Sequence, residues 1–340
     1  MLQLIKRYPL FALLCAGLLT LPGWEQALPA ALQISGSLRT VFIFAIIGLG
    51  LNVVTGMCGL LNLGSAGFMA IGVYSYAILT SSIYPFQIGF WPGLLAAMLC
   101  AAASGLMLGL PAIRLRGDYL AIVTLGFGEI VQDLLRNLDG ITKGTQGINP
   151  LPYPSLFGYT LSSADHSAWY YLLATVLAAT LWISYNLEHS RHGRMWFAIR
   201  EDELAARSMG IYIVRAKLLA FSCSAAFAGL AGALWASYFS STGEPGNYDF
   251  NLSVLVLCII IVGGLSSIRG VVLGSIIMVG INSIVLDRLA RFLGTSDSSS
   301  AAAIFLSPTN WKYMIFGLVL ILMMRFRPEG ILGPTTQGRR

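Results

Sequence analysis

Long apolar stretches separated by short polar segments run along almost the whole chain. Several of them hold roughly 18–25 residues, enough for an α-helix to cross the ~30 Å hydrocarbon core of a bilayer. The strict alternation of apolar and polar positions that marks barrel strands is absent. The pattern predicts an all-α, polytopic membrane protein with about ten transmembrane helices. They are expected over 9–24, 38–56, 61–80, 88–112, 118–137, 168–187, 216–240, 251–265, 270–287 and 311–325.

The composition supports this fold class. Of the 340 residues, 56% are hydrophobic and 11% are charged, and the mean hydropathy is +0.74. Soluble domains carry about 25% charged residues, so the composition indicates an integral membrane protein. The five cysteines lie in apolar surroundings without a C-x-x-C pair, and His189 and His192 lack the partners of a metal pattern. Neither a metal site nor a cofactor is expected.

Lysine and arginine are distributed unequally between the two sides of the expected spans. With the N-terminus inside, 15 of the 21 basic residues fall on the cytoplasmic side and 6 fall outside. The positive-inside rule then places both termini in the cytoplasm. The net charge of +6 reflects this topology and not a nucleic-acid footprint. We expect one transmembrane domain over 1–340, with periplasmic loops at 138–167 and 288–310.

The first apolar stretch follows Lys6 and Arg7, as the hydrophobic region of a signal peptide would. No A-x-A cleavage site follows before Leu32, so the stretch is expected to remain as the first span.

One charged segment, 188–217, interrupts the apolar pattern. It holds 10 of the chain's 36 charged residues, which places it in water on the cytoplasmic side. Within it we predict a short helix with Glu201, Asp202 and Glu203 in its first turn and Gly210 at its end. Arg207 follows Glu203 by four residues, the spacing of a helical ion pair. The segment is either a solvated loop or a docking helix for a soluble partner.

Small residues recur inside the spans. Gly105 and Gly109 form a G-x-x-x-G pair, as do Gly270 and Gly274, and such pairs let helices pack closely in lipid. The stretch 59–72 differs because it places Asn62 and Ser65 among glycines at the start of a span. Discontinuous helices of transporters use such irregular backbone to line a cavity. A role in a transport path and plain tight packing both remain open here.

Glu129 is an ionisable residue inside an expected span. It follows Asp118 by eleven residues, which is ~16 Å along a helix at ~1.5 Å per residue. Intramembrane carboxylates commonly mark transport paths, although a structural hydrogen-bonding role is equally open. Thr124 and nearby glycines give the same helix a polar, closely packed face.

Sequence motifs of enzymes are missing. The chain has no P-loop, because the segment around Lys143 lacks the required spacing, and it has no G-x-S-x-G elbow and no H-E-x-x-H. We therefore expect a transport protein that does not itself hydrolyse ATP.

Four blocks of sequence resemble the LivM-type permease of branched-chain amino-acid ABC importers. The resemblance covers roughly 40–335, and its second block is the most specific. The blocks are GLLNLGSAGFMAIGVYSYA (59–77), RLRGDYLAIVTLGFGEIV (114–131), GRMWFAIREDELAARSMGI (193–211) and RPEGILG (327–333).

The resemblance implies an importer that works by ATP-driven alternating access. It implies a LivH-like second permease subunit, two cytoplasmic ABC ATPase subunits and a periplasmic substrate-binding protein. It also implies that part of 193–211 corresponds to the E-A-A…G loop that inserts into an ATPase cleft, here in the looser form E-D-E-L-A-A. The corresponding residues are Glu201, Asp202, Glu203, Ala205, Ala206 and Gly210.

The expected solute is a branched-chain or other hydrophobic amino acid. Asn62, Ser65, Thr124 and Glu129 are the candidate lining of its path. A similar family imports urea and short amides, but 117–119 and 124–125 here resemble the amino-acid type. Polar amino acids remain an alternative. So does a stand-alone secondary transporter, for which Glu129 is the one candidate coupling carboxylate.

Overall fold

The computed structural model describes residues 35–112, 115, 117–156, 159–162, 165–286, 311–327 and 329–333. The expected first span over 9–24 and the expected loop 288–310 lie outside the described residues.

Helices occupy every expected span from 38–56 onward, so the all-α prediction is confirmed. The described strands are the two-residue pair β1 and β2, which lies within the loop 138–167. The elements are α3 (Ser35–Leu51), η2 (Asn52–Met57), α4 (Ser65–Thr80), α5 (Phe90–Ala112), α6 (Asp118–Asn137), α7 (Asp139–Thr142), η3 (Gly144–Gln146), β1 (Ser155–Leu156), β2 (Tyr159–Thr160), α8 (His166–His189), α9 (Arg191–Glu201), α10 (Glu203–Ser208), α11 (Ile213–Phe239), η4 (Pro245–Asn247), α12 (Phe250–Gly263), α13 (Ile268–Gly280), η5 (Ile281–Leu286) and α16 (Lys312–Phe326).

Among the described residues, five helical segments are long and apolar enough to cross a membrane. Three further apolar helices, over 65–80, 268–283 and 314–326, are shorter. The five long segments are Gly36–Met57, Phe90–Ala112, His166–His189, Ile213–Phe239 and Pro245–Gly263.

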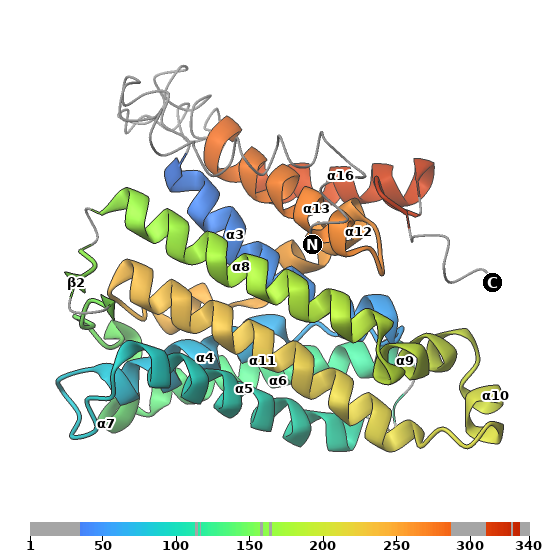
Figure 1. The fold of residues 1–340 in the computed structure, drawn as a ribbon, viewed down its shortest axis with the longest axis horizontal. Coiled ribbons are helices and arrows are strands. Elements are labelled where there is room, and N and C mark those ends of the chain that lie inside the picture. The colour runs from blue at the N-terminus through green and yellow to red at the C-terminus, as the bar shows by residue number, and fades with distance from the viewer. Residues whose placement is uncertain are drawn as a thin grey trace.

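The long helices run side by side, and the connecting segments gather at the two ends of the bundle (Figure 1). The short helices α9 and α10 of the charged segment lie at one end, and α7 and β2 of the loop 138–167 lie at the other (Figure 1). The two segments that the Lys/Arg distribution assigns to opposite sides are therefore at opposite ends. Which end is cytoplasmic remains a prediction from that distribution.

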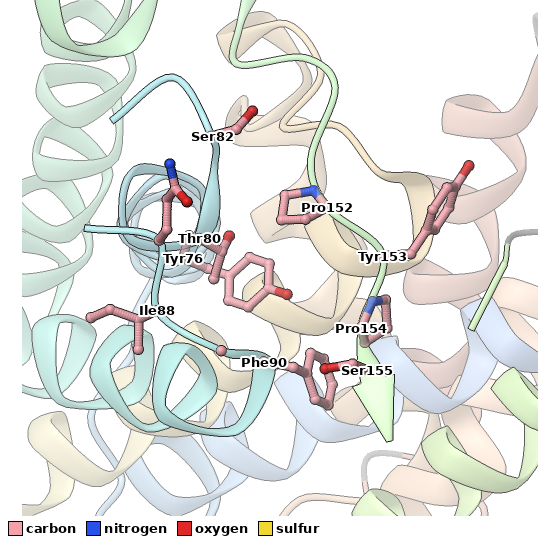
Figure 2. A pocket seen from close by; sticks show the side chains of 11 residues that line it. Tyr76, Thr80, Ser82, Ile88, Phe90, Pro152, Tyr153, Pro154 and Ser155 are labelled. Atoms are coloured by element: carbon pink, nitrogen blue, oxygen red, sulfur yellow. Dashed lines mark hydrogen bonds between the residues drawn. The ribbon is translucent and has the colours of Figure 1, made fainter. Parts of the chain in front are cut away.

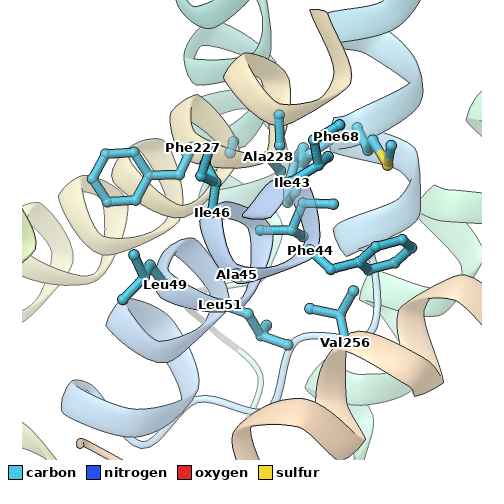
Figure 3. Close-up of a cluster of buried hydrophobic side chains, with 14 of the residues drawn as sticks. Ile43, Phe44, Ala45, Ile46, Leu49, Leu51, Phe68, Phe227, Ala228 and Val256 are labelled. Atoms are coloured by element: carbon cyan, nitrogen blue, oxygen red, sulfur yellow. The ribbon is translucent and has the colours of Figure 1, made fainter. Parts of the chain in front are cut away.

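Helix α3 forms the centre of the bundle. Its side chains Ile43, Ile46 and Leu49 are at most 1% exposed. Figure 3 shows them surrounded by Phe227 from α11 and Val256 from α12. A helix that is apolar on all sides is typical of a protein core or of a membrane span, and α3 is largely enclosed by its neighbours.

Small residues bring helices α4, α5, α11, α12 and α13 into close contact. A Cβ atom added to Gly105 would lie 2.6 Å from Ala225 Cβ, and one added to Gly109 would lie 2.8 Å from Leu218 Cδ2, both on α11. Gly274 on α13 likewise approaches the backbone of α12 at Gly263, where an added Cβ would be 3.0 Å from the amide nitrogen. Both G-x-x-x-G pairs therefore pack within the chain, as expected for helices in lipid.

The stretch that joins α3 to α4 is irregular. Helix α3 continues into the π-helix η2, the chain then runs without helical structure over 59–64, and α4 begins at Ser65 with Gly64 as its N-cap. Gly59 has φ +73°, which only glycine adopts without strain. The predicted irregular backbone is thus present over 59–64, whereas 65–72 belong to helix α4. The candidate path residue Asn62 lies in the irregular stretch, and Ser65 begins the helix.

Candidate coupling segment and substrate path

Two capped helices build the charged segment. The Ser190 side chain caps α9 by accepting a hydrogen bond from the Gly193 amide at 3.2 Å. Asp202 caps α10, because its Oδ1 accepts from the Leu204 and Ala205 amides at 2.8 and 3.1 Å. Gly210, at φ +82°, lets the chain turn away after α10. The predicted short helix and its glycine stop are confirmed.

The start of that helix differs from the prediction. Glu201 is the last residue of α9 and Asp202 is the N-cap, so Glu203 is the one acid of the three inside the first turn of α10. The predicted ion pair between Glu203 and Arg207 is not formed in the described structure. Glu203 Oε2 accepts from Lys217 Nζ at 2.9 Å, and the Lys217 side chain is only 2% exposed. A buried ammonium group without a partner is costly, so the Glu203 carboxylate pairs with Lys217 and not with Arg207 of its own helix.

The inner side of the segment rests on the start of α11. Trp196 of α9 is fully buried, and its indole nitrogen donates to the Ala216 carbonyl at 2.8 Å. Ala206 of α10 is 1% exposed. Cys58 lies near the Glu203–Lys217 pair, and burial raises the pKa of its thiol to about 12, so it stays protonated at neutral pH.

The outer side of the segment presents large apolar side chains to solvent. Leu204, Met209 and Tyr212 are 66%, 72% and 74% exposed. The Arg215 guanidinium lies over the Tyr212 ring, 5.3 Å from its centroid. Exposed apolar groups in a charged, water-facing segment are typical of a protein-binding surface. We call the charged segment 188–217 the candidate coupling segment, and Leu204, Met209 and Tyr212 its outer face.

The six residues that the sequence predicts for coupling differ in how far they are exposed. Ala205, Gly210 and Glu201 are exposed, whereas Ala206 is buried and Glu203 turns toward Lys217. Asp202 is exposed, but its carboxylate is engaged as the cap of α10.

Three of the four candidate path residues gather at the N-terminus of α4. Asn62 and Ser65 are buried there, and Asn62 Oδ1 accepts from the Gly64 amide at 2.9 Å. Thr124 reaches across from α6, where its hydroxyl accepts from the Leu63 amide at 2.9 Å. Asn62 Nδ2 and Ser65 Oγ are buried without a hydrogen-bond partner in the described part of the chain. Buried polar atoms without partners are rare in folded proteins.

Glu129 lines a closed crevice beside this cluster, which in this structure is too narrow to hold a water molecule. The crevice lies between the start of α4, the middle of α6 and the start of α12, where Asp249 and Ser253 also border it. Ser253 Oγ accepts from the Ala66 amide at 3.0 Å, which joins α12 to the first turn of α4. Two carboxylates and a helix N-terminus thus flank one crevice, and these groups can meet opposite charges of a zwitterion.

A wider pocket of about 250 Å³ opens at the end of the bundle that carries α7 and β2, between the α4–α5 connection and 152–155 (Figure 2). Its walls carry Tyr76, Thr80, Phe90 and Tyr153, with no ionisable acid or base other than the tyrosines. The Tyr76 hydroxyl donates to Ser237 at 3.3 Å.

The polar contacts between residues on different helices could not be predicted from the sequence. Lys217 is a single cation at the beginning of an apolar helix, and we counted it among solvated charges. The signal for its burial is the apolar run that follows it directly. Ser253 and Asp249 stand near the start of an expected span without a local motif, so nothing in the sequence connects them to Ala66.

The last sequence block folds back onto the bundle. The Ile331 and Leu332 amides donate to the Val262 and Gly263 carbonyls, each at 3.0 Å. This contact places RPEGILG against the end of α12.

The family of the permease component of branched-chain amino acid transport systems matches residues 33–324. The chain belongs to this family. Within it, the high-affinity branched-chain amino acid transport permease LivM of Escherichia coli (strain K12) is 40% identical over 314 residues, or 86% of this chain and 68% of that protein. The predicted resemblance to LivM-type permeases is confirmed. As a member of the family, the chain is a multi-pass membrane permease.

More distant permeases align over most of the same length. LivH of Salmonella typhimurium, from the same kind of transport system, is 27% identical over 91% of this chain and 97% of that protein. LsrC of Yersinia pseudotuberculosis, an autoinducer 2 import permease, is 25% identical over 80% of this chain and 67% of that protein. No solved structure matches.

Proposed function

We propose that this chain is one of two permease subunits of an ABC importer in a bacterial inner membrane, and that it carries branched-chain amino acids into the cytoplasm. The observation that carries the proposal is the 40% identity with LivM over 86% of the chain. A LivH-like permease would be the second membrane subunit, two ATPases would bind from the cytoplasm, and a periplasmic binding protein would deliver the solute.

The coupling segment supports the assignment of ATPase partners. Its inner side is held to α11 by the Glu203–Lys217 pair and by Trp196, so the segment is a rigid part of the membrane domain. Its outer face leaves Leu204, Met209 and Tyr212 in solvent. A helix that is attached to the membrane domain and exposes an apolar face can bind another protein and transmit its movement to the spans.

The crevice at the N-terminus of α4 supports an amino-acid path. The amide end of α4 attracts a carboxylate, and Glu129 and Asp249 attract an ammonium group. Gly64 and Gly67 approach α6 at Thr124 and Gly128. Movement of α4 relative to α6 would therefore open or close the crevice directly.

The function is tested by reconstituting the chain in liposomes with its second permease, the ATPases and the binding protein. We expect uptake of radiolabelled leucine only when ATP is on the ATPase side and the binding protein is on the other side. Uptake by this chain alone, driven by a proton or sodium gradient, would establish the secondary-transporter alternative. Preferential ATP-driven uptake of urea or of polar amino acids would replace the proposed solute class.

The path is tested with Ser65→Ala. Among the residues that the structure describes, the Ser65 hydroxyl has no hydrogen-bond partner, so its removal should not destabilise the protein. If the solute contacts this hydroxyl, the rate of leucine uptake falls about fivefold, the effect of one lost hydrogen bond.

The matched control for this test is Ser75→Ala, a half-buried serine further along the same helix. It should transport at the wild-type rate. Equal uptake by the two variants would remove Ser65 from the path.

A further inference from the structure

One arginine of the coupling segment reaches out of that segment into the spans. Arg200, on the last turn of α9, donates through Nη1 to the Gly56 carbonyl at 2.7 Å. The same nitrogen donates to the Ser266 hydroxyl in the turn between α12 and α13. The Ser266 hydroxyl in turn donates to the Gly56 carbonyl at 2.6 Å. A single guanidinium thus joins α9 to two separate parts of the membrane domain.

The backbone at this junction is irregular on both sides. Gly56 belongs to the π-helix η2, and π segments occur frequently at functional sites. Ser266 has φ +65°, a left-handed conformation that costs energy in a residue with a side chain. Its amide donates to Asn52 Oδ1 at 2.9 Å, and Asn52 Nδ2 is buried without a partner in the described structure. The junction is specified by polar contacts that hold two unusual backbone segments together.

A short stretch of chain connects this junction to the candidate path. Gly59 packs on the Arg200 side chain so closely that an added Cβ would lie 2.9 Å from Arg200 Cγ. From there the chain runs directly to Leu63, whose amide is bonded to Thr124 at 2.9 Å. A displacement of Arg200 therefore acts on the 56–64 segment, and this segment leads to the first turn of α4.

We propose that Arg200 is the positioning residue that transmits movement of the coupling segment to 56–64 and to the α12–α13 turn, and so opens and closes the crevice at the start of α4. This inference rests on the proposed function. The planar guanidinium is suited to the role because its donors have fixed directions, so two acceptors on different segments move with it. A lysine in its place would present a single point charge without that fixed geometry.

The test compares Arg200→Met with Arg194→Met in the reconstituted importer. Methionine keeps much of the unbranched apolar stem that packs on Gly59 and removes the donors to Gly56 and Ser266. Leucine uptake and ATP hydrolysis are measured in the same liposomes. We expect Arg200→Met to keep its ATPases and their hydrolysis while uptake per ATP falls about tenfold, as the loss of a charged hydrogen bond would cause. Arg194 donates to the His189 carbonyl beside its own helix, so its variant should keep the wild-type ratio.

Ser266→Gly separates transmission from folding. Glycine removes the hydroxyl that bridges Arg200 and Gly56 and also relieves the left-handed strain at φ +65°. We expect this variant to melt near the wild-type temperature and still to lose uptake per ATP. If Ser266→Gly keeps the wild-type ratio, the proposed linkage is wrong even where Arg200→Met does not fold. Absence of ATP-driven uptake by the wild type would instead refute the proposed function.

Discussion

Replacing Glu203 with lysine is expected to leave little folded protein. The substitution puts a second ammonium group beside Lys217, whose side chain is 2% exposed and whose Nζ lies 2.9 Å from the lost carboxylate. Breaking a buried pair costs about 3 kcal/mol or more, because the remaining charge stays in the interior without a partner. The thermal transition of the detergent-solubilised protein, followed by fluorescence-detected size exclusion, measures the loss.

Glu201→Lys is the matched control for this prediction. It makes the same change two residues earlier, at an exposed position at the end of α9. This variant should melt close to the wild type. The double variant Glu203→Met, Lys217→Met removes both charges together and should recover most of the stability, since apolar side chains can replace a buried pair. Equal melting of the two lysine variants would show that the pair does not hold α10 in place.

Truncating the outer face of the coupling segment is expected to release the ATPases without unfolding the permease. Leu204 and Met209 are 66% and 72% exposed, so Leu204→Ala, Met209→Ala removes few internal contacts. A minority of interface residues, clustered near the centre, cost about 1 kcal/mol or more each when truncated. We place Leu204 and Met209 in this minority, so the double variant should bind the ATPases at least tenfold more weakly. Co-purification of the ATPase subunit and ATP-driven uptake are the two readouts.

A control with the same residue types is available on α5. Met107 and Leu110 are 73% and 61% exposed on a candidate membrane span that is not part of 188–217. Met107→Ala, Leu110→Ala should retain the ATPase subunit fully. Retention of the ATPase by the Leu204/Met209 variant as well would remove the outer face from the docking surface.

The predictions for Glu203 and for Leu204 with Met209 concern opposite sides of the coupling segment. The E-D-E-L-A-A pattern marks the short helix to which we assign coupling, but residues next to each other in this pattern point in different directions. Glu203 and Ala206 are three apart and share the inner face of α10, whereas Leu204 lies on the outer face. Substitutions at the inner positions are therefore expected to report on folding, and substitutions at the outer positions on docking.

Much of the fold could be predicted from the sequence because lipid imposes simple rules. Apolar runs of a fixed length mark the helices, and each expected span from 38–56 onward coincides with one. Gly105, Gly109, Gly270 and Gly274 marked close helix packing correctly, since only small side chains allow it. Gly210 also ended the short helix as expected.

The long-range polar contacts could not be predicted in the same way. The spacing of Glu203 and Arg207 suggested a pair within one helix, yet Glu203 meets Lys217 of the next helix. Arg200 looked like any solvated charge of 188–217, yet it bonds to Gly56 and Ser266. Such contacts depend on which helix ends meet, and no local pattern records that.

The helical membrane fold, the family and the place of the charged segment in the chain follow from the sequence alone, because hydrophobic length, small-residue spacing and charge are local properties. The buried charges, the side of α10 that meets solvent and the connection of Arg200 to Thr124 through 56–64 become visible in the folded chain. A polar group in a dry interior pairs with a partner wherever the fold places one, in some cases more than a hundred residues away in the chain.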